Sequence, residues 1–150
     1  MALNIVLFEP EIPNNTGNIG RLALASGSKL HLVKPFGFEL NDSRLKRAGL
    51  DYWQHLDVTI YDSIDAFFDH HYDKKFAFFS SHGHKLYWKI PFKNDMFLIF
   101  GKESVGLPKH LIKTYKEQLY KIPLHNEHIR SLNLSNAVSI VVYEGLRQLT

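Results

Sequence analysis

The C-terminal stretch Ile122-Pro-Leu-His-Asn-Glu-His-Ile-Arg-Ser-Leu-Asn-Leu-Ser-Asn136 does most to decide how this chain folds. The apolar run just before it, 119–122, predicts a short strand that Pro123 ends. After the polar loop, apolar residues recur at helical spacing, which predicts a C-terminal helix, although the β-branched run 139–142 also suits a strand. Because this helix is apolar on more than one side, we expect it to pack on its own core and on a partner. Its N-cap is one of three polar residues: Ser131, Asn133 or Ser135.

The composition limits the class of protein. A chain of 150 residues that is 45% hydrophobic and 22% charged fits a single globular domain over residues 1–150. It has no cysteine, which excludes a disulfide framework, thiolate chemistry and a cysteine metal site. There is no apolar run of membrane-spanning length and no recognisable signal peptide, so we expect a cytoplasmic protein that does not enter a membrane. The net charge of +3 suits an anionic partner such as RNA without requiring one.

Short apolar runs alternate with segments of helical pattern along the rest of the chain. The predicted strands are 3–8, 30–33, 58–61, 76–79, 96–100 and 119–122. Helices are predicted after residue 18, over 44–48 and 63–70, and from Pro108 onward. Alternating elements with solidly apolar strands predict an α/β protein whose mostly parallel sheet is flanked by helices.

Polar loops follow four of the predicted strands, at 14–18, 80–84, 101–106 and 123–136. In parallel sheets, ligands bind at the loops that leave the carboxyl ends of the strands. The last three loops follow consecutive strands, so we expect one site built from three loops, provided that these strands are neighbours in the sheet. The glycine signatures of dinucleotide-binding and P-loop proteins and the nucleophile elbow of α/β hydrolases are missing.

Two charged residues in or near these loops allow more than one interpretation. Glu103, between Gly101 and Gly106, can hold an amino or hydroxyl group of a ligand or be a solvated carboxylate, and the pattern alone favours the second. Arg21 is unexpected close to the start of a helix, because cations are more stable at the other end. It therefore indicates a bound anion or a reacting group about as readily as an ordinary surface arginine.

The chain has nine histidines, and two close pairs are the candidates for metal ligands, His82 with His84 and His125 with His128. Catalytic zinc sites take three protein ligands and structural ones take four. Neither pair has a third ligand at a suitable spacing, so we expect no metal site.

A small basic group, Arg44, Lys46 and Arg47, is followed by the aromatic residues Tyr52 and Trp53. Cations beside aromatic rings suit RNA, because the phosphates take the charge and the bases stack on the rings. A solvated helix face explains the same pattern equally well. We predict that Arg44, Lys46 and Arg47 contact RNA.

Three motifs taken together resemble those of SPOUT-class RNA methyltransferases. They are Asn15-Thr-Gly-Asn-Ile-Gly-Arg21, Phe100-Gly-Lys-Glu-Ser-Val-Gly-Leu107, and the stretch from Ile122-Pro-Leu through Arg130-Ser-Leu-Asn-Leu-Ser-Asn-Ala-Val with Tyr143-Glu144. The opening stretch 5–14 and Leu45-Lys-Arg-Ala-Gly-Leu-Asp-Tyr52 narrow the resemblance to the small ribose 2′-O-methyltransferases of the tRNA wobble position, the TrmL or YibK-like family. The resemblance spans essentially the whole chain.

The resemblance implies the SPOUT α/β fold with a C-terminal trefoil knot, a homodimer, and S-adenosyl-L-methionine as cofactor without a metal. The implied reaction is 2′-O-methylation of the ribose of nucleotide 34, a cytidine or uridine, in tRNA, with leucine isoacceptors as the family's substrates. Two alternatives stay open. The same fold can methylate another RNA such as rRNA, or the chain can be an RNA-binding protein without catalysis.

Carried over by position, the resemblance assigns roles to individual residues. The catalytic positions are Arg21, Asn15, Glu103 and Asn133, and Tyr143 is an RNA-binding position on a helix that faces the dimer partner. The cofactor positions are Phe79, Gly101, Ile122, Leu124, Ser131 and Leu132. The chain departs from the family at Lys102, where many members have proline, at Val105, where many have arginine, and in the loop 122–131, which is one residue longer.

Overall fold

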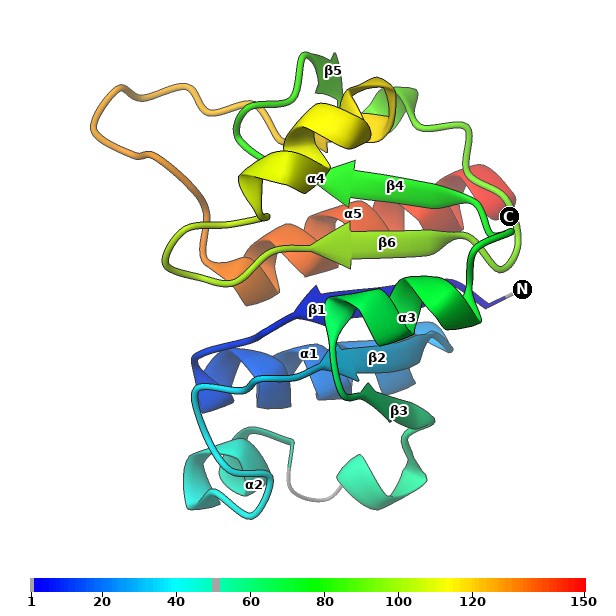
Figure 1. Cartoon of the computed structure of the whole chain (residues 1–150). Coiled ribbons are helices and arrows are strands. Elements are labelled where there is room, and N and C mark those ends of the chain that lie inside the picture. The colour runs from blue at the N-terminus through cyan, green and yellow to red at the C-terminus, as the bar shows by residue number, and fades with distance from the viewer. Residues whose placement is uncertain (1, 50–51) are drawn as a thin grey trace.

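Seven parallel strands form one sheet in the part of the chain that this computed structural model describes, residues 2–49 and 52–150 (Figure 1). Along the chain the strands are β1 (Asn4–Phe8), β2 (Lys29–Val33), β3 (Val58–Tyr61), β4 (Phe76–Phe79), β5 (Lys85–Leu86), β6 (Phe97–Phe100) and β7 (Leu119–Lys121). Across the sheet their order is β3-β2-β1-β6-β4-β7-β5. The strands β6, β4 and β7 are therefore neighbours.

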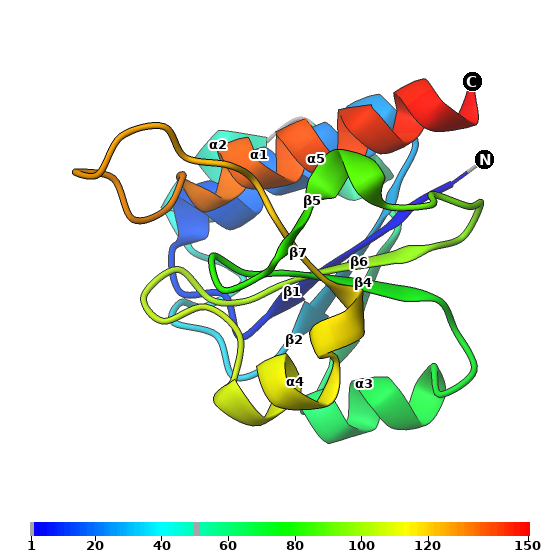
Figure 2. The same ribbon diagram turned by 90° about the horizontal axis from the view of Figure 1, so that it is seen from above.

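The helices cover both faces of this sheet (Figure 2). They are α1 (Pro13–Ser26), α2 (Ser43–Gly49), α3 (Ile64–His70), α4 (Lys109–Thr114) and α5 (Leu134–Leu149), with 3-10 turns at Trp53–His55, Tyr87–Lys89 and Lys116–Gln118. Figure 2 shows α1 and α5 on one face and α3 and α4 on the other, while α2 packs against α1. None of the helices within the described ranges is long and apolar enough to cross a membrane.

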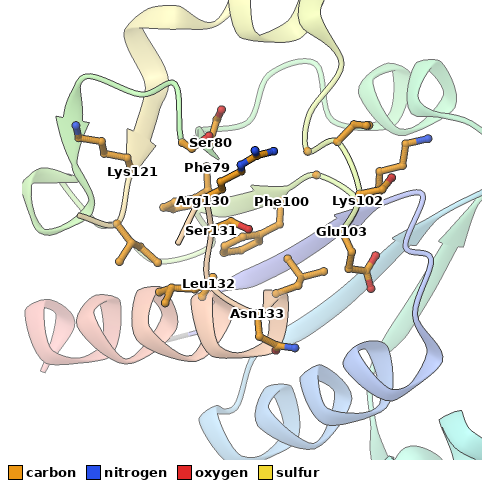
Figure 3. Close-up of a pocket in the computed structure, with 18 of the residues that line it drawn as sticks. Phe79, Ser80, Phe100, Lys102, Glu103, Lys121, Arg130, Ser131, Leu132 and Asn133 are labelled. Atoms are coloured by element: carbon orange, nitrogen blue, oxygen red, sulfur yellow. The ribbon is translucent and has the colours of Figure 1, made fainter. Parts of the chain in front are cut away.

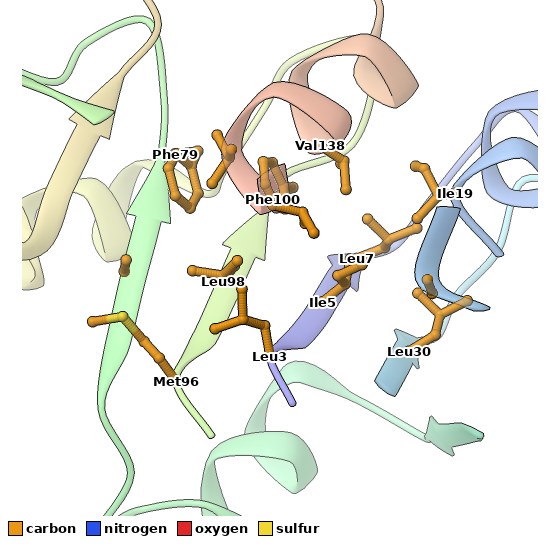
Figure 4. Packing of buried hydrophobic residues seen from close by; sticks show 14 of the residues in the cluster. Leu3, Ile5, Leu7, Ile19, Leu30, Phe79, Met96, Leu98, Phe100 and Val138 are labelled. Atoms are coloured by element: carbon orange, nitrogen blue, oxygen red, sulfur yellow. The ribbon is translucent and has the colours of Figure 1, made fainter. Parts of the chain in front are cut away.

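Alternate side chains of each strand enter two separate cores, as a sheet covered on both faces requires. The core under α1 and α5 contains Leu3, Ile5, Leu7, Ile19, Leu98, Phe100 and Val138 (Figure 4). The core under α3 and α4 contains Val6, Phe8, Phe67, Phe78, Ile99 and Leu111. Because the central strands are buried on both faces, they occur in the sequence as continuous apolar runs.

The predicted α/β fold with a parallel sheet is confirmed, and all six predicted strands are present. β5 was missed because it has only two residues and no apolar run. The prediction of a loop at 14–18 is wrong, since α1 begins at Pro13, whose fixed φ suits the first turn of a helix. Asn15 and Thr16 are buried in that first turn. The trefoil knot that the resemblance implies stays a prediction.

The C-terminal segment is a helix throughout, so the alternative of a strand at 139–142 is wrong. Of the three candidate caps, the structure selects Asn133, whose side-chain oxygen accepts hydrogen bonds from the N–H groups of Ser135 at 2.9 Å and Asn136 at 3.4 Å. Such a cap satisfies donors that the first helical turn cannot satisfy itself. The cap fixes where the loop 122–133 ends.

A buried polar cluster lies on the α3 side of the sheet. His31 has its Nε2 at 2.8 Å from Asn4 Oδ1 and its Nδ1 at 2.8 Å from the Tyr61 hydroxyl, which lies 2.8 Å from His71 Nε2. The Asn4 amide group donates to the carbonyl of Asp95, so its oxygen is the atom that faces His31. Nε2 of His31 therefore donates, and Nδ1 accepts from Tyr61. Burial, and then the nearby His71, lower the pKa of His31 to about 4 from the ordinary 6.5.

We expect this histidine to make the fold less stable in mild acid. Between pH 6.5 and about 4 the unfolded chain binds a proton at His31 that the folded chain does not, so the free energy of unfolding falls as pH falls through this range. The loss reaches about 3 kcal/mol near pH 4. Urea unfolding from pH 7.5 to 4.5 tests this, with His31→Gln reducing the pH dependence and His110→Gln, an exposed histidine, leaving it unchanged. An equal slope in all three proteins would contradict the prediction.

Candidate active site

A pocket of about 480 Å³ lies at the carboxyl ends of β4, β6 and β7 (Figure 3). Its walls are formed by residues 79–82, 100–106, 120–122, 124 and 130–134, together with Ile12 and Asn15 at the start of α1. The expectation that three loops build one site is confirmed, because the three strands that precede them are neighbours in the sheet. The volume is in the usual range for sites that bind small molecules and cofactors.

Two stacked aromatic rings form an apolar surface inside this pocket. Phe79 at the end of β4 and Phe100 at the end of β6 pair across the parallel register, and their rings are 4.6 Å apart at an angle of 10°. Both are almost completely buried, although both line the pocket. Polar backbone and side-chain groups of the loops surround this surface, as expected for a ligand that carries a flat aromatic group and a polar part.

The loop after β6 leaves no room for a side chain at its first residue. A Cβ atom on Gly101 would lie 2.2 Å from the backbone carbon of Gly106 and 2.2 Å from the nitrogen of Leu107. The loop closes on itself through the hydrogen bond from Gly106 N–H to the carbonyl of Lys102 at 2.9 Å. Glycine at position 101 is therefore what lets this loop fold back tightly at the edge of the pocket.

Glu103 joins this loop to the first turn of α1. One carboxylate oxygen accepts a hydrogen bond from the N–H of Glu11 at 2.8 Å, and the other accepts from the N–H of Ile12 at 3.0 Å and from the side chain of Asn15 at 3.2 Å. The N-cap residue of α1, Ile12, has no side chain that can cap the helix. The carboxylate of Glu103 lies beside this end of α1 and accepts from the two N–H groups just before the helix, where the helix dipole favours negative charge.

The connection between the two segments is reciprocal and extends to α5. The carboxylate of Glu11 accepts a hydrogen bond from the N–H of Ser104 at 2.8 Å, and the hydrogen bonds from Ser104 lower the pKa of Glu11. On the other side, the side chain of Asn133 donates to Asn15 at 3.0 Å. A continuous network therefore runs from the 101–106 loop through the first turn of α1 to the N-cap of α5.

This network predicts that Glu103→Gln destabilises the protein. The new amide group places a donor against a backbone N–H, so one donor loses its acceptor, and we expect the free energy of unfolding to fall by about 1–3 kcal/mol. Urea denaturation measures the change. The control is Glu117→Gln, whose carboxylate is exposed and lies 3.8 Å from Lys85, and which we expect to change stability by only a few tenths of a kcal/mol. Equal stability of the two variants would show that the network contributes little.

Three cationic residues stand around the pocket: Lys102, Lys121 and Arg130 (Figure 3). Lys102 lies 3.7 Å from Glu9 in a half-exposed ion pair. Val105, at the position where the family often has arginine, is 74% exposed and also lines the pocket. None of these cations was predicted as a site residue. The available signal was the position of Lys102 within the second motif and of Arg130 within the third.

The structure brings together most, but not all, of the residues that the sequence analysis selected. All six predicted cofactor positions line the pocket, and so do Asn15, Glu103 and Asn133. Arg21 is not among the lining residues, and it is exposed on α1. The predicted RNA contacts also lie elsewhere: Arg44, Lys46 and Arg47 are on α2, and Tyr143 is on the outer side of α5. Within residues 2–49 and 52–150, no cluster of three potential metal ligands occurs.

A parallel sheet of this order, with a pocket built from the loops after three neighbouring C-terminal strands, defines a SPOUT-class methyltransferase fold. The chain belongs to the SpoU rRNA methylase family, whose sequence model matches residues 2–143. The tRNA (cytidine(34)-2'-O)-methyltransferase of Escherichia coli K12 is 43% identical over 148 residues, which are 98% of this chain and 94% of that protein. The protein of the same name from Saccharophagus degradans is 44% identical over 147 residues, 97% of this chain and 95% of its own.

Solved structures agree with this assignment and confirm the predicted resemblance. One that is described as giving structural insights into the 2-OH methylation of C/U34 on tRNA has a TM-score of 0.94 and 42% identity, and the match covers 99% of this chain and 96% of that chain. The SpoU methyltransferase AviRb from Streptomyces viridochromogenes, solved in complex with AdoMet, has a TM-score of 0.85 and 23% identity, and the match covers 97% of this chain and 57% of that chain. At that identity the likeness concerns the fold alone.

Proposed function

We propose that this chain transfers a methyl group from S-adenosyl-L-methionine to the ribose 2′-hydroxyl of nucleotide 34 in tRNA. The observation that carries the proposal is the convergence of all six predicted cofactor positions on one pocket, in a chain that is 43% identical over nearly its full length to a protein named for this reaction. The stacked rings of Phe79 and Phe100 suit the adenine of the cofactor, and the polar loops suit its ribose and amino-acid part.

The residues of this chain have to hold the ribose in line with the methyl group and make its hydroxyl more nucleophilic. When it is bound, S-adenosyl-L-methionine supplies a methyl group that is already electrophilic. Arg21 is a poor base, because a guanidinium carries five N–H donors and no acceptor for a proton. We therefore assign Arg21 an electrostatic role, in which it binds the adjacent phosphate and stabilises the developing oxyanion. The proton leaves to that phosphate or to water.

Glu103 is not assigned the role of a general base. Both of its oxygens already accept hydrogen bonds, three in total: two from the backbone of Glu11 and Ile12 just before α1, and one from the side chain of Asn15 in its first turn. A carboxylate held in this way positions the loop 101–106 and the side chain of Asn15, which lines the pocket. Glu103 and Asn133 thus contribute to catalysis by holding the pocket together.

A homodimer forms part of the proposal. Arg21 lies outside the pocket of its own chain, and on α5 Tyr143 is 49% exposed while Ile140 and Leu146 are partly exposed. If α1 and α5 pack against a second copy, Arg21 can approach the partner's pocket, and a complete site then takes residues from both chains. RNA contacts from Tyr143 and from the basic residues of α2 complete the proposed substrate surface.

The experiment that tests the proposed function is methyl transfer from labelled S-adenosyl-L-methionine to total tRNA from a strain that lacks this gene, followed by mapping of the methylated nucleotide. Label on the ribose of nucleotide 34, in leucine isoacceptors, is the expected result. No label in tRNA, together with label in rRNA, would favour the alternative substrate. Binding of the cofactor without transfer to any RNA would contradict the proposed activity and favour an RNA-binding protein.

A further inference from the structure

The exposed guanidinium of Arg21 lies over an aromatic ring from another part of the chain. Its central carbon is 5.0 Å from the centroid of the Tyr52 ring, a distance at which the cation is attracted by the face of the ring. Tyr52 is 38% exposed and Arg21 is exposed as well, so the pair lies at the surface of the molecule. The contact joins a predicted catalytic residue on α1 to the segment that follows α2.

The position of Tyr52 is fixed by the turn that follows it. The 3-10 turn Trp53–His55 is closed by hydrogen bonds from His55 N–H to the carbonyl of Tyr52 at 3.0 Å and from Leu56 N–H to the carbonyl of Trp53 at 3.1 Å. This turn packs on α1 at Gly20, where the absence of a side chain lets the two segments approach closely. A Cβ atom on Gly20 would lie 2.7 Å from the ring of Trp53 and 3.1 Å from Leu56.

Gly20 and Arg21 are adjacent in α1. The contact of the turn with Gly20 and the contact of the Tyr52 ring with Arg21 therefore belong to one interface. An arginine side chain has many rotamers and loses this freedom when it binds a substrate group in one geometry. A ring that covers one face of the guanidinium removes part of this freedom in advance. The N–H donors lie in the plane of the guanidinium and stay available for phosphate or ribose oxygens.

We propose that Tyr52 is a positioning residue for Arg21 in methyl transfer, and that it acts through the face of its ring. The inference rests on the proposed function, since it needs Arg21 to act on the substrate. It also explains why the turn 53–55 packs so closely on Gly20. The ring, and not the hydroxyl group of Tyr52, is the part that matters for this role.

The test compares two variants. Tyr52→Phe keeps the aromatic ring, whereas Tyr52→Leu removes the ring and keeps an apolar side chain. We expect Tyr52→Leu to lower kcat roughly fivefold, in line with a cation–π contact at a half-exposed site, while the KM for tRNA and the Kd for S-adenosyl-L-methionine stay the same. Tyr52→Phe should keep full activity. Tyr72→Leu, which changes a tyrosine that is 83% exposed, is the control and should behave as the unmodified protein. Thermal unfolding of each variant checks that the fold is retained.

Several outcomes would overturn this inference. A normal kcat in Tyr52→Leu would show that the ring does not position Arg21, and a change confined to the KM for tRNA would show that Tyr52 contacts RNA directly. Equal losses in Tyr52→Phe and Tyr52→Leu would assign the effect to the hydroxyl group. In an Arg21→Ala background, which removes the cation, Tyr52→Leu should add little to the loss already present, and full additivity would contradict the coupling. If the unmodified protein transfers no methyl group or Arg21→Ala remains active, the failure lies in the proposed function instead.

Discussion

Arg21→Ala is expected to lower kcat for methyl transfer to tRNA by about two to three orders of magnitude, while the Kd for S-adenosyl-L-methionine stays within about twofold. A decrease in kcat of this size is typical when one group that stabilises a developing oxyanion is removed from an active site. The unchanged cofactor affinity follows from the geometry, because Arg21 does not line the pocket that contains all six predicted cofactor positions. Single-turnover methyl transfer and calorimetric titration of the cofactor measure the two quantities separately.

Two further variants make this result specific to the guanidinium. Arg21→Lys keeps the positive charge but loses the planar fork of donors, so we expect an intermediate kcat. Lys74→Ala removes an exposed charge from the segment after α3, on the opposite face of the sheet from α1, and should leave kcat unchanged. Turnover that survives in Arg21→Ala would show that another residue stabilises the reacting hydroxyl.

The placement of Arg21 also shows where reasoning from the sequence reached its limit. The motif 15–21 was interpreted as a loop followed by a helix, which allows both ends of the motif to face one site. In the structure the whole motif is helical, and six residues correspond to about 600° of rotation, so Asn15 and Arg21 point about 120° apart. Asn15 therefore reaches the pocket and Arg21 does not. The error came from the polar character of 14–18, because the burial of Asn15 depends on partners far away in the sequence, at Glu103 and Asn133.

The sheet was more predictable than the site for a simple physical reason. Central strands of a parallel sheet are buried on both faces, so each is a continuous apolar run that can be recognised without its neighbours. The order of the strands depends on long-range pairing, and only that order shows that the three C-terminal loops meet. Glu103 is a similar case. The pattern favoured a solvated carboxylate, but donors about 90 residues away in the sequence, at Glu11 and Ile12, occupy it.

Gly101→Ala is expected to abolish measurable binding of S-adenosyl-L-methionine, or to raise its Kd on the order of 100-fold, because the added methyl group has nowhere to go. The atoms that it would meet, 2.2 Å away, belong to the backbone of Gly106 and Leu107 and cannot be moved aside by a side-chain rotation. The loop 101–107 therefore has to open. This displaces the end of β6 and breaks the hydrogen bonds that Glu103 accepts from Glu11 and Ile12. Overpacking of this kind costs about 1–3 kcal/mol of stability in addition.

Gly27→Ala separates the loss of the pocket from the loss of stability. Gly27 ends α1 with a φ of 67°, and a Cβ atom there meets nothing within 4 Å. Alanine is strained in this left-handed conformation by about 1–2 kcal/mol, so this variant should lose stability by an amount similar to Gly101→Ala. It lies at the far end of α1 from the pocket, so its affinity for the cofactor should stay normal. If both glycine variants bound the cofactor as the unmodified protein does, the pocket next to Gly101 would not be the cofactor site. A molecule bound in that pocket contacts the 101–107 loop, so a rearranged loop has to lower its affinity.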